Sequence, residues 1–455
     1  MKTTAVKSAA MFSASSRMDA PFYLNDAVAY YAGLEKCPYE LTTVGESAKD
    51  VFFGNIFSRC FVKDAEHGVP YLRASEIQKA DLDSGGLFLS KKQAHQLDYL
   101  RLKRDWILVT CSGTLGKCVY ADARYEEFIG THDLIRIIPG GGRILPGVLY
   151  SFLASKFGFA TLTHSQYGSV ILHTNPDQVR TIQIPVFPEE VQKRVNRLVL
   201  DSAHLREEAD AARREAVGYF AHYDVEKQPT CFSKRLSKIG FSFAAYNNNL
   251  DVDAIRAKYA DDSATIDELS NGIFLPPLFK HIYLDHDNGH PFFTGREITF
   301  QNQRPYRWLS PLGVKDIDDY TVTKGTLLVY KSGVIDGGMY GDVRIVDDDL
   351  DGASLSNHVA RITPKTFAEG CWMYAFLKSS AGFKLLQSLA IGTAIPEMTP
   401  KHIATVRIPR PNRDLGKIER LVSEYISKRV KSNNMENEAI GLVESEIARW
   451  QEGGV

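Results

Sequence analysis

The chain has 455 residues, of which 44% are hydrophobic and 24% are charged. These values exclude a disordered, collagen-like or low-complexity protein, and the length predicts about two to four domains. With 54 Lys and Arg against 55 Asp and Glu, the formal net charge is -1, so any nucleic-acid surface must come from local clustering of cations.

The first half of the chain, residues 1–187, predicts a domain of mixed helices and strands. Two β-rich runs, at 106–110 and 134–138, are separated by glycine-rich turns. A short helix is expected to follow at about 146–157. A domain with this order of elements belongs to the α+β class.

The sequence of residues 229–411 predicts a second domain with the same order of elements. Its β-rich runs lie at 326–330 and 358–362, and a helix is expected at about 371–390. We therefore expect two α+β domains of one architecture.

Two long helical patterns follow the two domains, and we assign residues 188–228 and 412–455 to them. In the first, apolar residues recur three or four positions apart from about 189 to 223. The second has the same spacing from about 414, with a candidate break at 432–434. Two such stripes bury each other most simply as an antiparallel coiled coil, although each helix could instead cap its own domain.

The two halves repeat each other with a period of about 224 residues, which indicates a duplicated domain and not a solenoid. Histidines also fall in comparable places, at His132 and His358, each shortly before an Arg-Ile pair. Four phrases recur in the same order: 70–77 with 291–298, 108–113 with 328–333, 150–155 with 374–379, and 182–185 with 406–409.

The sequence contains no recognisable catalytic motif. No dinucleotide-binding, zinc-protease or hydrolase motif is present, and the P-loop-like run 111–118 lacks the first glycine and the closing hydroxyl. We interpret the acidic run 347–351 as a solvated turn, because a calcium loop needs spaced ligands. His132 and His358 are more simply fold positions than catalytic bases. We expect no enzyme activity, metal or cofactor of the chain's own.

The cysteines and the start of the chain indicate the compartment. The six cysteines are scattered without a C-x-x-C pair, which is typical of a reducing environment. No long apolar stretch predicts a secretory signal or a membrane span. We expect a cytoplasmic protein that contacts no membrane.

Polar loops in equivalent places of the two halves are the candidate DNA contacts. Hydroxyls, amides, aromatic rings and cations are the groups that bond phosphates and base edges. For any single residue, ordinary loop polarity is the simpler interpretation, so the hypothesis rests on the set. The first half contributes Arg73, Ser75, Ser112, Thr114, Lys117, Gln166, Tyr167 and Ser169. The second half contributes Thr294, Arg296, Lys331, Ser332, Tyr340 and Thr393.

The sequence also suggests how these residues correspond. Arg73 and Ser75 pair with Thr294 and Arg296. The second group pairs Ser112, Thr114 and Lys117 with Lys331, Ser332 and Tyr340.

The duplicated order resembles the specificity subunit of type I restriction-modification systems, from about residue 40 to the end of the chain. The motifs that carry this resemblance are the phrase 70–77, the strand and turn 105–116, the Tyr-x-Phe-Leu-x-Ser helices at Tyr150 and Tyr374, the glycine turns 167–169 and 391–393, and the Ile-Pro phrases before each long helix.

The resemblance implies a DNA reader without catalysis of its own. Two target recognition domains would each read half of a split site in double-stranded DNA, and the long helices would set the spacing between the halves. The helices would also dock adenine methyltransferase subunits, expected to be two, which bring S-adenosylmethionine. Restriction and translocase subunits could join the complex.

Two features depart from the family's pattern or qualify it. The phrase Pro-x-x-x-Gln is present at 188–192 but lacks its glutamine at 411–417, which puts equal docking of two methyltransferases in doubt. The leader 17–23 resembles that of divergent members, which also serve methylation-based phage defence. Two alternatives remain open, a protein scaffold that no longer reads DNA and an enzyme with an unrecognised site.

Overall fold

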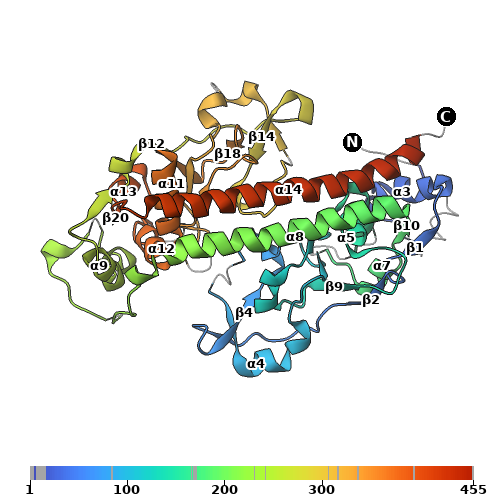
Figure 1. Ribbon diagram of the computed structural model, residues 1–455, viewed down its shortest axis with the longest axis horizontal. Helices are drawn as coiled ribbons and strands as arrows, with labels where there is room; N and C mark the ends of the chain where they lie inside the picture. Colours follow the sequence, from blue (N-terminus) through green and yellow to red (C-terminus); the bar gives the residue numbers. More distant parts are fainter. Residues whose placement is uncertain are drawn as a thin grey trace. The chain divides into compact units, whose positions relative to one another are not determined.

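The structure is a computed structural model (Figure 1). It describes residues 5–6, 17–82, 86–164, 166–167, 172–229, 231–240, 242–305, 307–314, 317–335, 338–392 and 395–452. The contacts divide the chain into two units, Met1–Glu207 with Lys431–Val455 as unit 1 and Glu208–Val430 as unit 2. Each unit therefore holds part of both long helices. The division into four segments made from the sequence stays a prediction.

Unit 1 contains a two-stranded sheet, β1-β10, and two four-stranded sheets, β2-β9-β6-β7 and β3-β5-β4-β8. Its strands are β1 (Leu41–Thr43), β2 (Ala48–Phe52), β3 (Phe61–Val62), β4 (Gly68–Leu72), β5 (Phe88–Ser90), β6 (Ile107–Thr110), β7 (Cys118–Tyr120), β8 (Ile129–Gly130), β9 (Leu134–Pro139) and β10 (Gln183–Pro185). Its shorter helices are α2 (Ala20–Tyr23), α3 (Ala27–Gly33), α4 (Lys91–Gln96), α5 (Pro146–Ala154), α6 (Lys156–His164) and α7 (Pro176–Arg180).

Unit 2 repeats this topology, with sheets β11-β20, β12-β19-β16-β17 and β13-β15-β14-β18. Its strands are β11 (Ser263–Thr265), β12 (Ser270–Phe274), β13 (Tyr283–Leu284), β14 (His290–Phe293), β15 (Arg307–Leu309), β16 (Leu327–Tyr330), β17 (Val343–Ile345), β18 (Ser354–Leu355), β19 (Val359–Pro364) and β20 (Arg407–Pro409). Its shorter helices are α9 (Leu250–Ala257), α10 (Gly295–Ile298), α11 (Phe367–Lys378), α12 (Ser380–Gln387) and α13 (Pro400–Ala404).

The predicted duplication and the α+β class are confirmed strand by strand. In both units the third sheet contains one parallel pair, β4 with β8 and β14 with β18, and the other strand pairs are antiparallel. The helix expected at about 371–390 is two helices, because α11 ends at Lys378 and α12 begins at Ser380.

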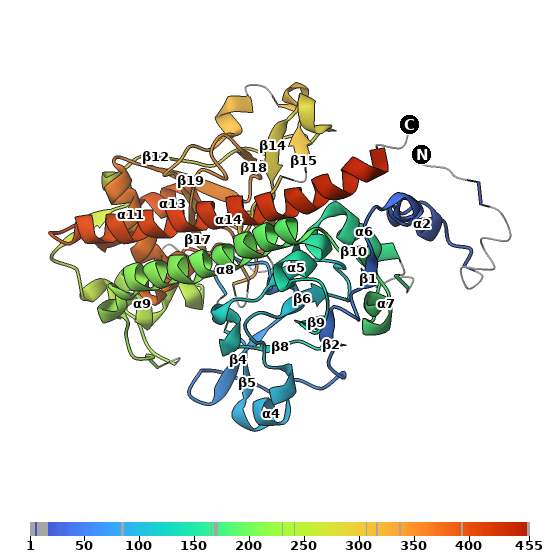
Figure 2. The ribbon, with the colours of Figure 1, turned by 45° about the vertical axis from the view of Figure 1, so that its right-hand side comes forward.

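The central strands explain how each domain builds its core. All four residues of β6 are buried, and successive side chains of a strand point to opposite faces. Ile107 and Val109 join the core that contains α5, whereas Leu108 joins a second core on the other face. In unit 1, α5 lies between this sheet and a long helix (Figure 2). The apolar runs in the sequence are therefore strands covered on both faces.

The long helices are α8 (Glu189–Gly218) and α14 (Leu415–Glu452). The helix expected to reach residue 223 ends at Gly218, and a short 3-10 turn follows at Ala221–Tyr223. The candidate break at 432–434 does not occur, because α14 is continuous there. Ser432 is buried, and its hydroxyl donates to the carbonyl oxygen of Ser202 at 2.9 Å. This tertiary contact outweighs the weak helix propensity of the segment.

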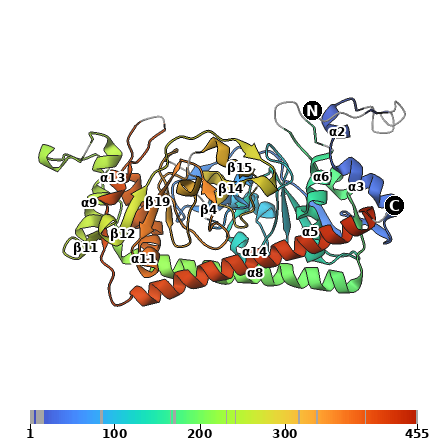
Figure 3. The ribbon, with the colours of Figure 1, turned by 90° about the horizontal axis from the view of Figure 1, so that it is seen from above.

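Within each unit the two helices run antiparallel (Figure 3). In unit 1, Arg194 contacts Glu438, and Ser202 contacts Ser432. In unit 2, Glu208 contacts Lys428 and Glu215 contacts Lys417. Residue numbers thus rise along α8 as they fall along α14. The helices therefore bury each other, as the sequence predicted, and do more than cap their own domains.

None of the helices in the described part of the chain combines the length and the apolar character that a membrane crossing requires.

Candidate nucleic-acid interface

Two loops meet in unit 1 and bring several of the candidate residues together. Gly113, in the loop after β6, donates its N–H to the carbonyl of Leu172 at 3.0 Å, and Thr174 donates to the carbonyl of Cys111 at 3.1 Å. Tyr167 and His173 exchange both backbone hydrogen bonds, at 3.0 and 2.8 Å. We call this arrangement the loop junction of unit 1.

Unit 2 builds the same junction from the loop after β16. Gly333 donates to the carbonyl of Pro396 at 3.3 Å, and Met398 donates to the carbonyl of Lys331 at 2.8 Å. Ile391 and Glu397 exchange both backbone hydrogen bonds, at 2.9 Å each. The same pattern of four bonds therefore fixes the loop junction of unit 2, and the two junctions can be matched residue by residue.

Both junctions depend on a glycine backbone at the same point. Gly113 has φ 69° and Gly333 has φ 140°, values that side chains with a Cβ rarely adopt. A tight turn of this kind carries the loop away from the end of the buried strand and towards the second loop. The same pattern of backbone hydrogen bonds thus occurs twice, around two glycines that differ in φ.

The side chains displayed by the two junctions differ. Ser112 matches Ser332, but Tyr167 matches Ile391 and His173 matches Glu397. Where unit 1 has an exposed phenol, unit 2 has an aliphatic side chain. Where unit 1 has an imidazole, unit 2 has a carboxylate. Such groups offer different hydrogen-bonding patterns to a base edge.

The residue of unit 2 that occupies the position of Lys117 differs from the one that the sequence suggested. Thr110, at the end of β6, donates to the carbonyl of Lys117 at 3.0 Å, and Tyr330, at the end of β16, donates to the carbonyl of Asp342 at 3.0 Å. The position of Lys117 is therefore occupied by Asp342 in unit 2, where the loop is longer. The pairing of Lys117 with Tyr340 is wrong, because it ignores this insertion.

The remaining residues of the first junction are accessible to different degrees. Thr114 is exposed, and Ser112, Lys117 and Gln166 are half-buried. The Lys117 ammonium lies 5.3 Å from the ring centre of Phe159, a cation–π distance. The carbonyl of Gln166 accepts a hydrogen bond from Arg17 at 2.9 Å.

Lys331 and Tyr340 lie inside unit 2. Their exposed fractions are 7% and 0%, and the Lys331 ammonium lies 3.4 Å from the carboxylate of Glu397. A buried side chain cannot reach a base without a rearrangement of the domain, so we correct the set by removing these two residues. Ser332 remains half-buried, and its hydroxyl lies 2.8 Å from Nδ1 of the exposed His358.

Arg73 and Thr294 match as the sequence suggested, because each caps the turn that follows its strand. The backbone N–H and guanidinium of Arg73 donate to the carboxylate of Glu76 at 2.8 to 3.1 Å. The N–H and hydroxyl of Thr294 donate to Glu297 at 2.8 and 2.9 Å. Both side chains thus have a structural task in addition to any contact with DNA.

Ser75 and Arg296 are exposed at the matching position of these two turns. A hydroxyl in unit 1 therefore stands where unit 2 has a guanidinium. Ser169 and Thr393, the last two candidates, lie outside the described residues.

A cluster that the sequence did not identify lies beside the first junction. Arg59 donates to the phenol oxygen of Tyr71 at 2.7 Å, and its Nη2 lies 3.3 Å from Nδ1 of His132. Burial and the Arg59 charge lower the pKa of His132, although Asp133 opposes them. The backbone of Asp133 holds this cluster next to Cys111, through a 3.3 Å hydrogen bond. Loop contacts between residues this distant in sequence give no sequence signal.

His132 and His358, which the sequence placed at comparable positions of the two halves, differ by one position in the structure. Cys111 donates to the carbonyl of Asp133, and Lys331 donates to the carbonyl of His358, so His358 matches Asp133 and not His132.

The Arg-Ile pairs that follow these histidines have a structural role. Arg136 and Arg361 are buried. Their guanidiniums donate to backbone carbonyls of their own units. Burial lowers the pKa of each to about 10. We therefore exclude both guanidiniums from the candidate interface.

The acidic run 347–351 is only partly solvated, which corrects our interpretation. Asp347 is 1% exposed and forms an ion pair with the buried Arg429 of α14. Asp348 is exposed and pairs with Lys324 at 2.6 Å. In the described part of the chain, no group of three or more potential ligands could hold a metal ion.

No family model and no curated protein matches this chain. Several solved structures are similar to it, among them the following three. The S subunit of a type I restriction-modification system from M. genitalium is 13% identical, with 91% of this chain and 96% of that chain covered and a TM-score of 0.34. The HsdS subunit from Thermoanaerobacter tengcongensis is 14% identical, with 92% and 97% covered and a TM-score of 0.26.

The third is a structure of the type I restriction-modification system described by its complex assembly and conformational transition. It is 15% identical, with 92% of this chain and 99% of that chain covered and a TM-score of 0.29. One of these three neighbours is thus named as the S subunit of a type I system, and another as an HsdS subunit.

Proposed function

We propose that this chain is a DNA sequence-specificity subunit that reads a bipartite site in double-stranded DNA and directs an adenine-N6 methyltransferase to it. The observation that carries the proposal is the duplicated loop junction. One backbone arrangement occurs twice, held by matching hydrogen bonds, and presents two different sets of side chains. A reader of two unlike half-sites needs one scaffold and two sets of contacts.

The long helices supply the second part of the proposal. Each belongs partly to unit 1 and partly to unit 2, and neither is interrupted between them. At about 1.5 Å per residue, the 30 residues of α8 correspond to roughly 45 Å. A continuous helix pair of this length would set the gap between two half-sites, as a dimer interface does in symmetric DNA-binding proteins.

The partners follow from the resemblance. Methyltransferase subunits, expected to be two, would dock on the helices and bring S-adenosylmethionine, and restriction or translocase subunits would join where the system includes them. In this proposal the chain itself binds and positions and performs no chemistry. A near-neutral net charge of -1 fits a reader that shares its phosphate contacts with its partners.

The competing proposal is a scaffold that keeps the helices but no longer reads DNA. Salt-dependent DNA binding discriminates between the two. We expect the complex with the methyltransferase to bind DNA with an affinity that falls as salt rises, and to bind one bipartite sequence above others. Binding no stronger or more selective than that of the methyltransferase alone would favour the scaffold.

A further inference from the structure

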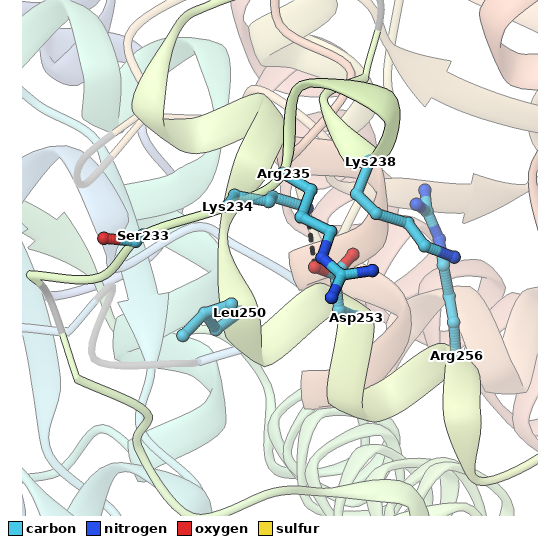
Figure 4. A pocket seen from close by; sticks show the side chains of 7 residues that line it. All are labelled: Ser233, Lys234, Arg235, Lys238, Leu250, Asp253 and Arg256. Carbon is cyan, nitrogen blue, oxygen red and sulfur yellow. Dashed lines mark hydrogen bonds and ion pairs between the residues drawn. The ribbon is translucent and has the colours of Figure 1, made fainter.

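A basic pocket of about 430 Å³ lies in unit 2, between helix α9 and the segment that leads from α8 to it (Figure 4). Four cations, Lys234, Arg235, Lys238 and Arg256, line it together with one carboxylate, that of Asp253. The side chains of Arg235, Lys238 and Arg256 all extend into the same region (Figure 4).

The positive charge of this pocket is not balanced by its own lining. The Lys234 ammonium donates to the Asp253 carboxylate at 2.6 Å, so these two charges neutralise each other. Among the described residues, no carboxylate lies within ion-pair distance of Arg235, Lys238 or Arg256. Three like charges around one cavity repel one another, and a bound anion would relieve that repulsion.

The sequence around the pocket has the same bias. Residues 231–250 contain Lys234, Arg235 and Lys238 and no Asp or Glu, in a chain that is almost neutral as a whole. The matching helix of unit 1, α3, has the sequence AVAYYAG and no charge. Its Gly33 is covered by the side chain of Gln451 from α14, which would lie 2.5 Å from an added Cβ. Helix α3 therefore supplies no counterpart of Arg256.

The exposure of the three cations indicates the kind of anion. Arg235, Lys238 and Arg256 are all exposed, and so they lack the buried donors with which a protein encloses a single phosphate ion. Exposed cations gain little from one small anion in water. They contribute additively along a polyanion, because each phosphate that they neutralise releases a condensed counterion.

We propose that this pocket binds phosphates of the DNA backbone and anchors unit 2 to the duplex without reading bases. This inference rests on the proposed function, since it adds a sequence-independent contact to a DNA reader. It assigns the phosphate-binding role to a segment outside both loop junctions.

The test compares the wild-type complex with a variant in which Arg235→Gln, Lys238→Gln and Arg256→Gln are combined. We expect the slope of log Kd against log salt to become shallower by about two to three, since each phosphate contact contributes about 0.9. The methylated sequence should not change. An unchanged slope would overturn the inference.

Two further variants keep the test independent of folding. Arg235→Lys combined with Arg256→Lys retains the charge and should retain the wild-type slope. Asp253→Asn removes the one carboxylate and should steepen the slope by about one, in the opposite direction to the triple variant. If Asp253→Asn weakens binding, or the charge-retaining variant behaves like the triple variant, the effect is structural and the inference fails.

Inorganic pyrophosphate and ATP distinguish a small phosphate ligand from the DNA backbone. If calorimetry finds that either binds the wild type below about 0.1 mM and not the triple variant, while the DNA slope is unchanged, the pocket serves a free phosphate compound and the backbone assignment is wrong. If the wild-type complex shows no selective DNA binding, the proposed function fails, which is a different result from an unchanged slope.

Discussion

Arg206 of α8 and Glu436 of α14 form a buried ion pair inside unit 1. Nη1 donates to Oε1 at 2.9 Å, and Nη2 lies 2.9 Å from Oε2. The phenol of Tyr150, in α5, donates to the same carboxylate at 2.6 Å. Burial and the Glu436 charge hold the pKa of Tyr150 well above its usual value, so the phenol remains a donor at neutral pH. The network ties both helices to the first domain.

Removing the Glu436 charge should destabilise the protein strongly, because it leaves Arg206 buried without a counterion. We expect Glu436→Gln to lower the free energy of unfolding by about 3–5 kcal/mol. The matched control is Glu438→Gln, which removes the exposed ion pair with Arg194 and should cost at most about 1 kcal/mol. Denaturant unfolding of the full chain measures both, and equal losses would show that the buried pair is not an anchor.

The exposed candidate residues of the two units should control the two half-sites separately. We expect Lys117→Ala to relax recognition of the half-site read by unit 1 and Arg296→Ala that read by unit 2, each by about 1–3 kcal/mol for a specific base contact. Methylation of oligonucleotides randomised in one half at a time gives the answer. A variant that relaxes both halves, or neither, contradicts the assignment of one half-site to each unit.

Lys331→Met provides the control for that experiment. Lys331 is buried beside Glu397, so its replacement should change the free energy of unfolding more than it changes the recognised sequence.

The length of the helix pair should set the gap and leave the half-sites alone. Deleting about seven residues from α8 near Glu208, and the facing seven from α14 near Lys428, removes about two turns and nearly preserves the helical phase. The loss of about 10 Å corresponds to about three base pairs. Mapping the methylated motif tests this. An unchanged gap would mean that the helices are not the spacer.

The turn after β4 should make stability depend on pH. Burial raises the pKa of Glu76, but hydrogen bonds from Arg73 and the charge of Lys79 outweigh it and leave that pKa below its ordinary value. A lowered folded-state pKa stabilises the protein above the ordinary pKa, and this stability is lost as pH falls through the folded-state pKa.

Glu76→Gln should therefore cost about 1–3 kcal/mol at pH 7, and the difference from wild type should shrink below a pH of about 4.5. Denaturant unfolding between pH 7 and pH 3 measures the difference, with the exposed Glu66→Gln as the control. If the difference in unfolding free energy does not vary with pH, the loss comes from packing and not from the carboxylate charge.

The duplication was predictable because its anchors are buried elements. The phrases 108–113 and 328–333 overlap β6 and β16, whose residues are all buried. Apolar spacing likewise predicted both long helices. The continuity of α14 through Ser432 was not predictable, because it depends on a contact with Ser202, which lies far away in the sequence.

The loops were predicted less well, for reasons that the structure explains. Lys117 matches Asp342 only because the second loop is longer, and local sequence does not locate an insertion between polar residues. The burial of Lys331 and Tyr340 depends on how the loop folds back onto its own domain. The basic pocket did leave a signal, the run Lys234-Arg235-x-x-Lys238 without nearby acids, but this run lies outside the four phrases that repeat between the two halves.

The central claim is tested most directly by co-expressing the chain with its methyltransferase and mapping modified adenines across the host genome. We predict one split motif with two defined halves and a fixed gap, lost when this chain is omitted. Methylation without a shared motif, or the same motif in the absence of this chain, would contradict a bipartite DNA reader.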